Sequence, residues 1–184
     1  MILALLQLRE YNTAMIGVTQ QFPPFGMTAV NANNEFIDVT LDDFDGMWKV
    51  FYFYPKDFTF ICPTEIKQMD RLVDEGVAVV GFSGDNEHCK VNWKQSNDLI
   101  GDISHTLGAD TGLYLAHALG IVDDLEGVAL RATYIVDDMN VIRSVTVNDL
   151  DTGRNVDETI RTLKALQAGG LTGCSWNPGD SFVG

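Results

Sequence analysis

The sequence predicts one α/β domain built around a parallel strand–helix–strand unit. Two apolar runs, residues 48–54 and 77–82, are rich in β-branched and aromatic residues and are typical of strands covered on both faces. Between them, a helix is expected to begin near Cys62-Pro63 and to end at Gly76. A strand–helix–strand order predicts a right-handed crossover and therefore a parallel pair of strands.

The remaining segments extend this unit on both sides. Turn-rich clusters separate paired strand-like runs, and asparagine followed three residues later by glutamate predicts a capping box. The additional expected elements are a hairpin of Phe25–Val30 with Glu35–Leu41, helices over 86–96 and 112–119, a strand over 104–108, a hairpin of Ala132–Val136 with Val141–Val147, and a helix from Asn155 to Gly169 with Glu158 in its capping box. Together they predict a thioredoxin-like α/β fold with an N-terminal β-hairpin.

The chain of 184 residues fits one compact domain with two flanking segments. We expect residues 1–14 to be an N-terminal extension, residues 15–170 the thioredoxin-like domain, and residues 171–184 a C-terminal tail. The first eight residues are apolar, but they lack a cationic start, and Arg9 and Glu10 interrupt them before any cleavage site. We therefore expect a cytoplasmic protein without a signal peptide.

The charge balance argues against two classes of partner. Twelve Lys and Arg against 26 Asp and Glu give a formal net charge of −14. Such a negative field repels nucleic acid and anionic lipid, and no stretch is long enough to span a membrane. The acidic residues are dispersed, as on a solvated surface.

The three cysteines, Cys62, Cys89 and Cys174, are too few and too far apart for a disulfide framework or a zinc site. Cys62 is placed where a buried strand meets a helix N-terminus, and the partial positive charge there favours the nucleophilic thiolate. Arg131 is a candidate cation for the same sulfur, and Thr59 supplies a hydroxyl three residues earlier. The alternative is that Cys62 is only a small apolar residue at a helix cap.

The residues around Cys62 favour a functional role. Pro55, Thr59 and Cys62 have the spacing Pro-x-x-x-Thr-x-x-Cys, within the run Phe-Tyr-Pro-Lys-Asp-Phe-Thr-Phe-Ile-Cys-Pro-Thr-Glu. This run resembles the AhpC-type branch of the typical two-cysteine peroxiredoxins. The similarity extends from about Met15 to Trp176 and includes Arg131, Gly153-Arg154-Asn155 and Cys174-Ser175-Trp176.

The resemblance implies a thiol-dependent peroxidase that reduces hydrogen peroxide and organic hydroperoxides. In this reading, Cys62 attacks the peroxide and becomes a sulfenic acid, which Cys174 of the partner subunit resolves as a disulfide. Thr59 would bind the peroxide, Arg131 would stabilise negative charge, and Pro55 would shield the thiolate. Glu65 and Arg154 resemble residues that orient the arginine network.

The same resemblance implies the partners. The protein would form a homodimer that assembles into a ring of dimers, and its disulfide would be reduced by thioredoxin, an AhpD-like protein or an AhpF-like flavoprotein. No metal, haem or flavin is needed on this chain. Trp93 is expected in the core, and Cys89 is expected to be a partly buried thiol without a catalytic role.

Several residues depart from the family pattern. Lys90 stands where many relatives have histidine, residues 98–102 replace a Gly-Gly-Leu-Gly stretch, and the tail after Cys174 lacks a Tyr-Phe helix. The last two differences predict a Cys62 loop that unfolds readily and an enzyme that resists overoxidation.

Three other functions are alternatives to the two-cysteine peroxidase. A dithiol oxidoreductase needs a second cysteine where Glu65 stands. A holdase or assembly protein would not need Thr59, Cys62 and Arg131 together. A one-cysteine peroxidase, with an external thiol that resolves Cys62, stays open.

Overall fold

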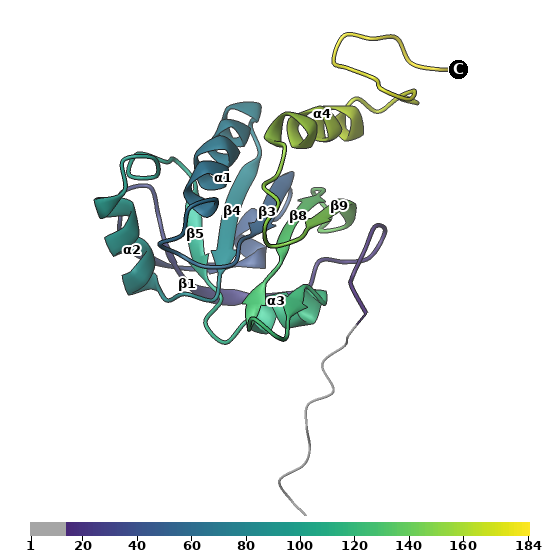
Figure 1. Cartoon of the computed structure of the whole chain (residues 1–184). Coiled ribbons are helices and arrows are strands. Elements are labelled where there is room, and N and C mark those ends of the chain that lie inside the picture. The colour runs from purple at the N-terminus through teal and green to yellow at the C-terminus, as the bar shows by residue number, and fades with distance from the viewer. Residues whose placement is uncertain (1–13) are drawn as a thin grey trace, which may run out of the picture.

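The computed structural model describes residues 14–184 and contains one central sheet of seven strands (Figure 1). The strands lie in the order β2-β1-β5-β4-β3-β8-β9. Their bounds are β1 Gly26–Val30, β2 Phe36–Thr40, β3 Lys49–Phe53, β4 Ala78–Ser83, β5 Thr106–Ala109, β8 Arg131–Val136 and β9 Ile142–Asn148. All but the last residue of the expected N-terminal extension lie outside the described residues.

The predicted strand–helix–strand unit is confirmed. Strands β3 and β4 pair in parallel, with Lys49 opposite Ala78, and helix α1, Cys62–Met69, connects them. The last part of the predicted helix is a 3-10 helix, η2, over Asp70–Glu75. It ends at Gly76, whose φ of 73° lies in the left-handed region that glycine adopts without steric cost.

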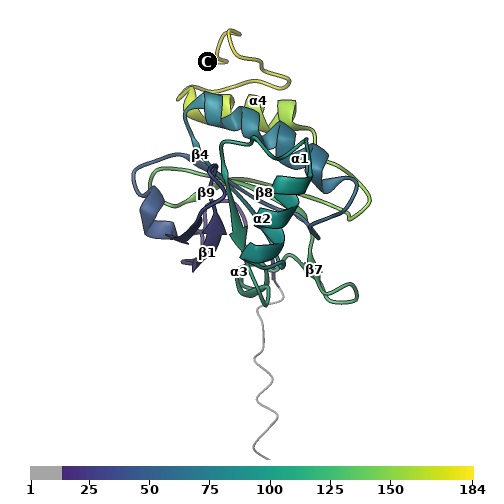
Figure 2. The same cartoon turned by 90° about the vertical axis from the view of Figure 1, so that its left-hand side faces the viewer.

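Side chains alternate across β3 and build a core on each face of the sheet. Tyr52 packs on one face with residues of α1, whereas Phe51 packs on the other face with residues of α3, Tyr114–Leu119. Helix α4, Val156–Gln167, lies beside α1, and α3 covers the opposite side of the sheet (Figure 2). Every residue of β3 is buried, as its composition predicts.

The remaining predicted elements are confirmed with small shifts at their ends. The two hairpins are the pairs β1–β2 and β8–β9, and α2 covers Glu87–Ser96 after the N-cap Asn86. Asn155 caps α4 as predicted, but the Glu158 carboxylate bonds to Arg161 and Thr162. The expected capping box is therefore absent: Asn155 is a simple N-cap, and Glu158 pairs with Arg161 on the helix surface.

Short elements were not expected from the sequence. They are a 3-10 helix, η1, over Leu41–Phe44 and a two-stranded ribbon of β6, Val122–Asp123, with β7, Val128–Ala129. Strands of two residues carry too little periodicity to be recognised.

Residues 171–184 follow α4 and extend away from the sheet (Figure 1). The tail folds back on itself: Trp176 is buried, and its ring stacks on that of Phe182. Arg161 of α4 donates to the Trp176 carbonyl at 2.8 Å and attaches the tail to the helix. Within residues 14–184, no helix is long and apolar enough to cross a membrane.

Candidate active site

Cys62 is the first residue of α1, and its side chain is fully buried. Pro63 follows in the first turn, where its missing N–H leaves no helix hydrogen bond unmade. The positive end of the helix dipole therefore lies at the sulfur, as expected from the sequence.

Arg131 is the cation beside this sulfur. It is the first residue of β8, and its Nη1 lies 3.4 Å from Cys62 Sγ. Its Nε donates to the Leu150 carbonyl at 2.6 Å, which fixes the orientation of the guanidinium plane. Burial by itself lowers the pKa of Arg131, but the hydrogen bond to Cys62 and the charge of Glu65 raise it above its ordinary value. The group therefore stays charged.

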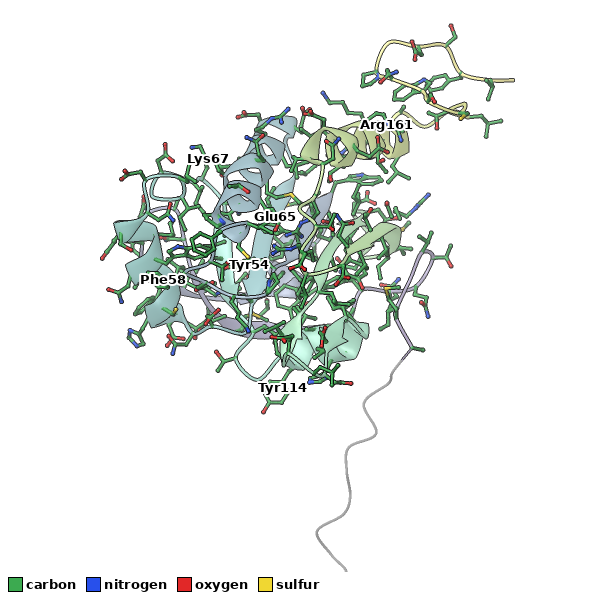
Figure 3. The ribbon with its side chains drawn as sticks, viewed as in Figure 1. Tyr54, Phe58, Glu65, Lys67, Tyr114 and Arg161 are labelled. Carbon is green, nitrogen blue, oxygen red and sulfur yellow. The ribbon has the colours of Figure 1, made fainter. Side chains whose placement is uncertain are left out.

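Glu65 joins Arg131 to Arg154. Its Oε2 accepts from Arg131 Nη1 at 2.6 Å and from Arg154 Nη2 at 2.9 Å, while its Oε1 accepts from Arg154 Nε at 2.9 Å. Burial raises the pKa of Glu65, but hydrogen bonds from Arg154 and the charges of both arginines outweigh it and lower the pKa. Glu65 lies on the inner side of α1 (Figure 3), where this buried carboxylate positions both guanidinium groups.

A series of side-chain contacts through Tyr52, His105 and Asp70 supports Arg154. Its guanidinium carbon lies 5.1 Å from the centre of the Tyr52 ring, a cation–π distance. The Tyr52 hydroxyl lies 2.8 Å from Nε2 of His105, whose Nδ1 lies 2.8 Å from Asp70. The ring fits because Gly81 stands opposite, where a Cβ atom would clash with Tyr52.

The charge of Asp70 fixes the direction of the bonds in this series. Burial raises the pKa of Asp70, but hydrogen bonds from the His105 side chain and the Ser104 backbone lower it to about 2. Burial also lowers the pKa of His105, so its imidazole is neutral at pH 7. Nδ1–H then donates to Asp70, and Nε2 accepts from the Tyr52 hydroxyl.

The segment of residues 55–61 leads from β3 into α1 and carries two predicted site residues. Pro55 is buried. The Thr59 hydroxyl donates to the Lys56 carbonyl at 2.9 Å, so in this conformation it braces its own loop. Phe58 has a φ of 55°, in a region where a bulky side chain costs about 1–3 kcal/mol.

The other two cysteines lie apart from this cluster. Cys89 is on α2 and is partly buried, as predicted, and its thiol lies 4.0 Å from Asp85. Burial, followed by the charge of Asp57, raises the pKa of Cys89 to about 11. Cys174 is exposed in the tail, where it lines a surface groove with Arg143 and Arg161. The structure thus brings Cys62, Glu65, Arg131 and Arg154 together and leaves Cys174 outside.

Comparisons with known proteins agree with this site. The model of the AhpC/TSA family matches residues 18–145. Alkyl hydroperoxide reductase C of Mycolicibacterium smegmatis is 36% identical, over 92% of this chain and 94% of the relative. The putative peroxiredoxin YkuU of Bacillus subtilis is 40% identical, over 90% of this chain and 97% of that protein.

Solved structures give the same result. The reduced 2-Cys peroxiredoxin of Plasmodium vivax matches with a TM-score of 0.85 and 32% identity, over 90% of this chain and 92% of that one. AhpC of Mycobacterium tuberculosis matches with a TM-score of 0.78 and 34% identity, over 84% and 99%.

Fold and site together define a thiol-dependent peroxidase on a thioredoxin-like fold, which confirms the enzyme class and fold predicted from the sequence. The chain belongs to the AhpC/TSA family of peroxiredoxins.

Proposed function

We propose that Cys62 is the peroxidatic residue of this enzyme and that hydrogen peroxide and organic hydroperoxides are its substrates. The thiolate sulfur attacks one peroxide oxygen, the O–O bond breaks, and the other oxygen leaves as water or an alcohol after taking up a proton. Cys62 is thereby oxidised by two electrons to a sulfenic acid. The observation that supports this most directly is the distance of 3.4 Å between Arg131 Nη1 and Cys62 Sγ inside a buried site.

The neighbouring residues have separate roles in this step. Arg131 stabilises the thiolate and the charge that develops on the departing oxygen. Glu65 and Arg154 position Arg131, because Glu65 bonds to both guanidinium groups. Thr59 turns its hydroxyl from the Lys56 carbonyl to a bound peroxide, and Pro55 shields the sulfur from water.

We further propose that Cys174 of a partner subunit resolves the sulfenic acid. Its thiol attacks Cys62 sulfur, a disulfide forms and water leaves. The exposure of Cys174 in a tail that extends from the sheet supports a partner on another chain (Figure 1). This step requires a homodimer, and the resemblance to the family supports the assembly of such dimers into a ring.

A separate dithiol must return the disulfide to two thiols. Thioredoxin, an AhpD-like protein and an AhpF-like flavoprotein are our candidate reductants. We place the protein in the cytoplasm, where such reductants keep thiols reduced. We keep the division into a thioredoxin-like domain over 15–170 and a tail over 171–184 as part of this proposal.

Non-reducing electrophoresis after one equivalent of peroxide tests both cysteines. The wild type should give a covalent dimer that dithiothreitol removes. The dimer should be lost in Cys62→Ser and in Cys174→Ser and kept in Cys89→Ser. If Cys174→Ser still turns over with an external thiol at the wild-type rate, the enzyme uses a one-cysteine mechanism and our resolving step is wrong.

A further inference from the structure

The proposed function requires the loop of residues 55–61 to move. Cys62 is fully buried, and a disulfide needs two sulfur atoms about 2 Å apart. A buried sulfur reaches an exposed Cys174 of a partner only if the loop that covers it leaves its place. The interactions that hold this loop therefore control the disulfide step.

Asp57 provides the buried side-chain attachment of this loop to the rest of the domain. Its side chain is fully buried, whereas Phe58 and Phe60 on the same loop are 58% and 96% exposed. Phe58 adds an aromatic contact, with its ring centre 5.9 Å from that of Trp93 on α2.

Two further polar contacts hold the loop: the Asp57 N–H donates to Asp85 Oδ2 at 2.7 Å, and the half-exposed Lys56 pairs with Glu126 at 3.5 Å. The bond of the Thr59 hydroxyl lies within the loop and does not fasten it to the sheet.

Lys90 of α2 holds the Asp57 carboxylate. Its ammonium group lies 3.4 Å from Asp57 Oδ1, and it donates to Ser83 Oγ at 2.6 Å and to the Tyr54 hydroxyl at 3.1 Å. Ser83 Oγ in turn lies 3.0 Å from Asp57 Oδ1. All three ammonium hydrogens thus have acceptors, and the lysine side chain is fully buried.

We propose that the buried Asp57–Lys90 ion pair is a releasable latch that keeps the Cys62 loop closed and sets how fast the disulfide forms. Both are positioning residues, because they act on Cys62 through the loop. The proposal rests on the function proposed above.

Three features support a contact that can release rather than one that is permanent. Asp57 Oδ2 is buried without a hydrogen-bond partner. Burial raises the pKa of Asp57 and lowers that of Lys90, so desolvation acts against both charges. Phe58, the next residue, has a left-handed backbone with a φ of 55°, and opening of the loop would relieve this strain.

The test compares Lys90→Met and Asp57→Asn with Lys94→Met. Lys94 is a matched control, since it is also a buried lysine of α2 but donates to the carbonyls of Asn31 and Ala32. Loop opening is measured on the reduced proteins, as the rate at which iodoacetamide alkylates Cys62, located by mass spectrometry. Hydrogen exchange of residues 56–61 is followed in parallel, and neither readout needs peroxidase activity.

Both latch variants should be alkylated at Cys62 roughly tenfold faster than the wild type, and Lys94→Met within about twofold of it. The two substitutions change the local charge in opposite directions, so an increase in both reports opening and not electrostatics. The double variant should open no further than the faster single variant, because both remove one contact.

Turnover gives the second readout. In the latch variants, disulfide formation after one equivalent of peroxide should be roughly tenfold faster, and less Cys62 sulfinic acid should accumulate at high peroxide. If Lys90→Met and Asp57→Asn match Lys94→Met in alkylation and exchange, the latch is wrong whatever the activity. If the loop opens as expected in the latch variants but neither the wild type nor Lys94→Met reduces peroxide, the proposed function is wrong, whereas the ion pair still holds the loop closed.

Discussion

The guanidinium of Arg131 lies 3.4 Å from the sulfur of Cys62, although one residue begins a strand and the other begins a helix. The two elements meet because β8 pairs with β3, and β3 leads through the loop into α1. Removal of this cation should affect the chemical step more than the fold, because Glu65 keeps Arg154 as a partner when Arg131 is lost.

Arg131→Met should lower the second-order rate of peroxide reduction by roughly 10²–10³. Arg131→Lys keeps the charge but loses the planar guanidinium, which bonds to both Cys62 and the Leu150 carbonyl. We therefore expect a rate between those of Arg131→Met and the wild type. Stopped-flow kinetics measures both. Arg71→Met, which removes an exposed arginine paired with Asp157, is the control and should stay within about twofold of wild type. An equal loss in Arg71→Met would mean that the effect is not local to Cys62.

Glu65→Gln should destabilise the fold as well as slow the reaction. Its carboxylate is the shared partner of Arg131 and Arg154. Loss of its charge leaves two buried guanidinium groups without their anionic partner. We expect a loss of about 3–5 kcal/mol in the free energy of unfolding, measured in urea. Glu75→Gln breaks a more exposed pair with Lys164 and should cost no more than about 1 kcal/mol. Similar losses in both variants would contradict the assigned role of Glu65.

Tyr134→Phe should stabilise the protein. The Tyr134 hydroxyl is buried without a hydrogen-bond partner, and burial raises its pKa well above the ordinary value. Its removal should increase the free energy of unfolding by about 1 kcal/mol. Tyr52→Phe removes a hydroxyl that is bonded to His105 and should act in the opposite direction. A destabilised Tyr134→Phe would indicate that this hydroxyl has a partner in solution.

Stability should fall at acid pH partly through Asp70. Its folded pKa of about 2 is below the ordinary 3.8, so it stabilises the fold above about pH 4 and loses that effect as the pH falls towards 2. His105 adds to the loss from about pH 6.5 downwards, because burial lowers its pKa and the unfolded chain takes up the proton first. Urea unfolding should show a shallower slope in Asp70→Asn between about pH 4 and pH 2, the range in which the Asp70 carboxylate takes up its proton. An unchanged slope would contradict the Asp70 contribution.

Local patterns made much of the fold predictable. The continuous apolar run of β3, the Cys62-Pro63 start of α1 and the Gly76 stop each depend on neighbouring residues, and all three are found in the structure. The contact between Cys62 and Arg131 was expected because both occur in motifs of the family. The structure adds that Glu65 bonds directly to both arginines.

Contacts between distant residues without a motif were not predictable. Tyr52, His105 and Asp70 come from a strand, a loop and the start of a 3-10 helix, and none has a distinctive neighbourhood in the sequence. Lys90 was noted only as a departure from the family pattern, and its pairing with Asp57 depends on how α2 packs against the loop. Thr59 was expected beside the sulfur, whereas its hydroxyl bonds to Lys56 in this conformation.

The central claim is that Cys62 carries the peroxidase chemistry. The most direct test is peroxide consumption with dithiothreitol as reductant, measured for wild type, Cys62→Ser and Cys89→Ser. We predict complete loss of turnover in Cys62→Ser and wild-type turnover in Cys89→Ser, since only Cys62 has the Arg131 guanidinium beside its sulfur. Undiminished turnover in Cys62→Ser would contradict the account and place the reactive thiol elsewhere on the chain.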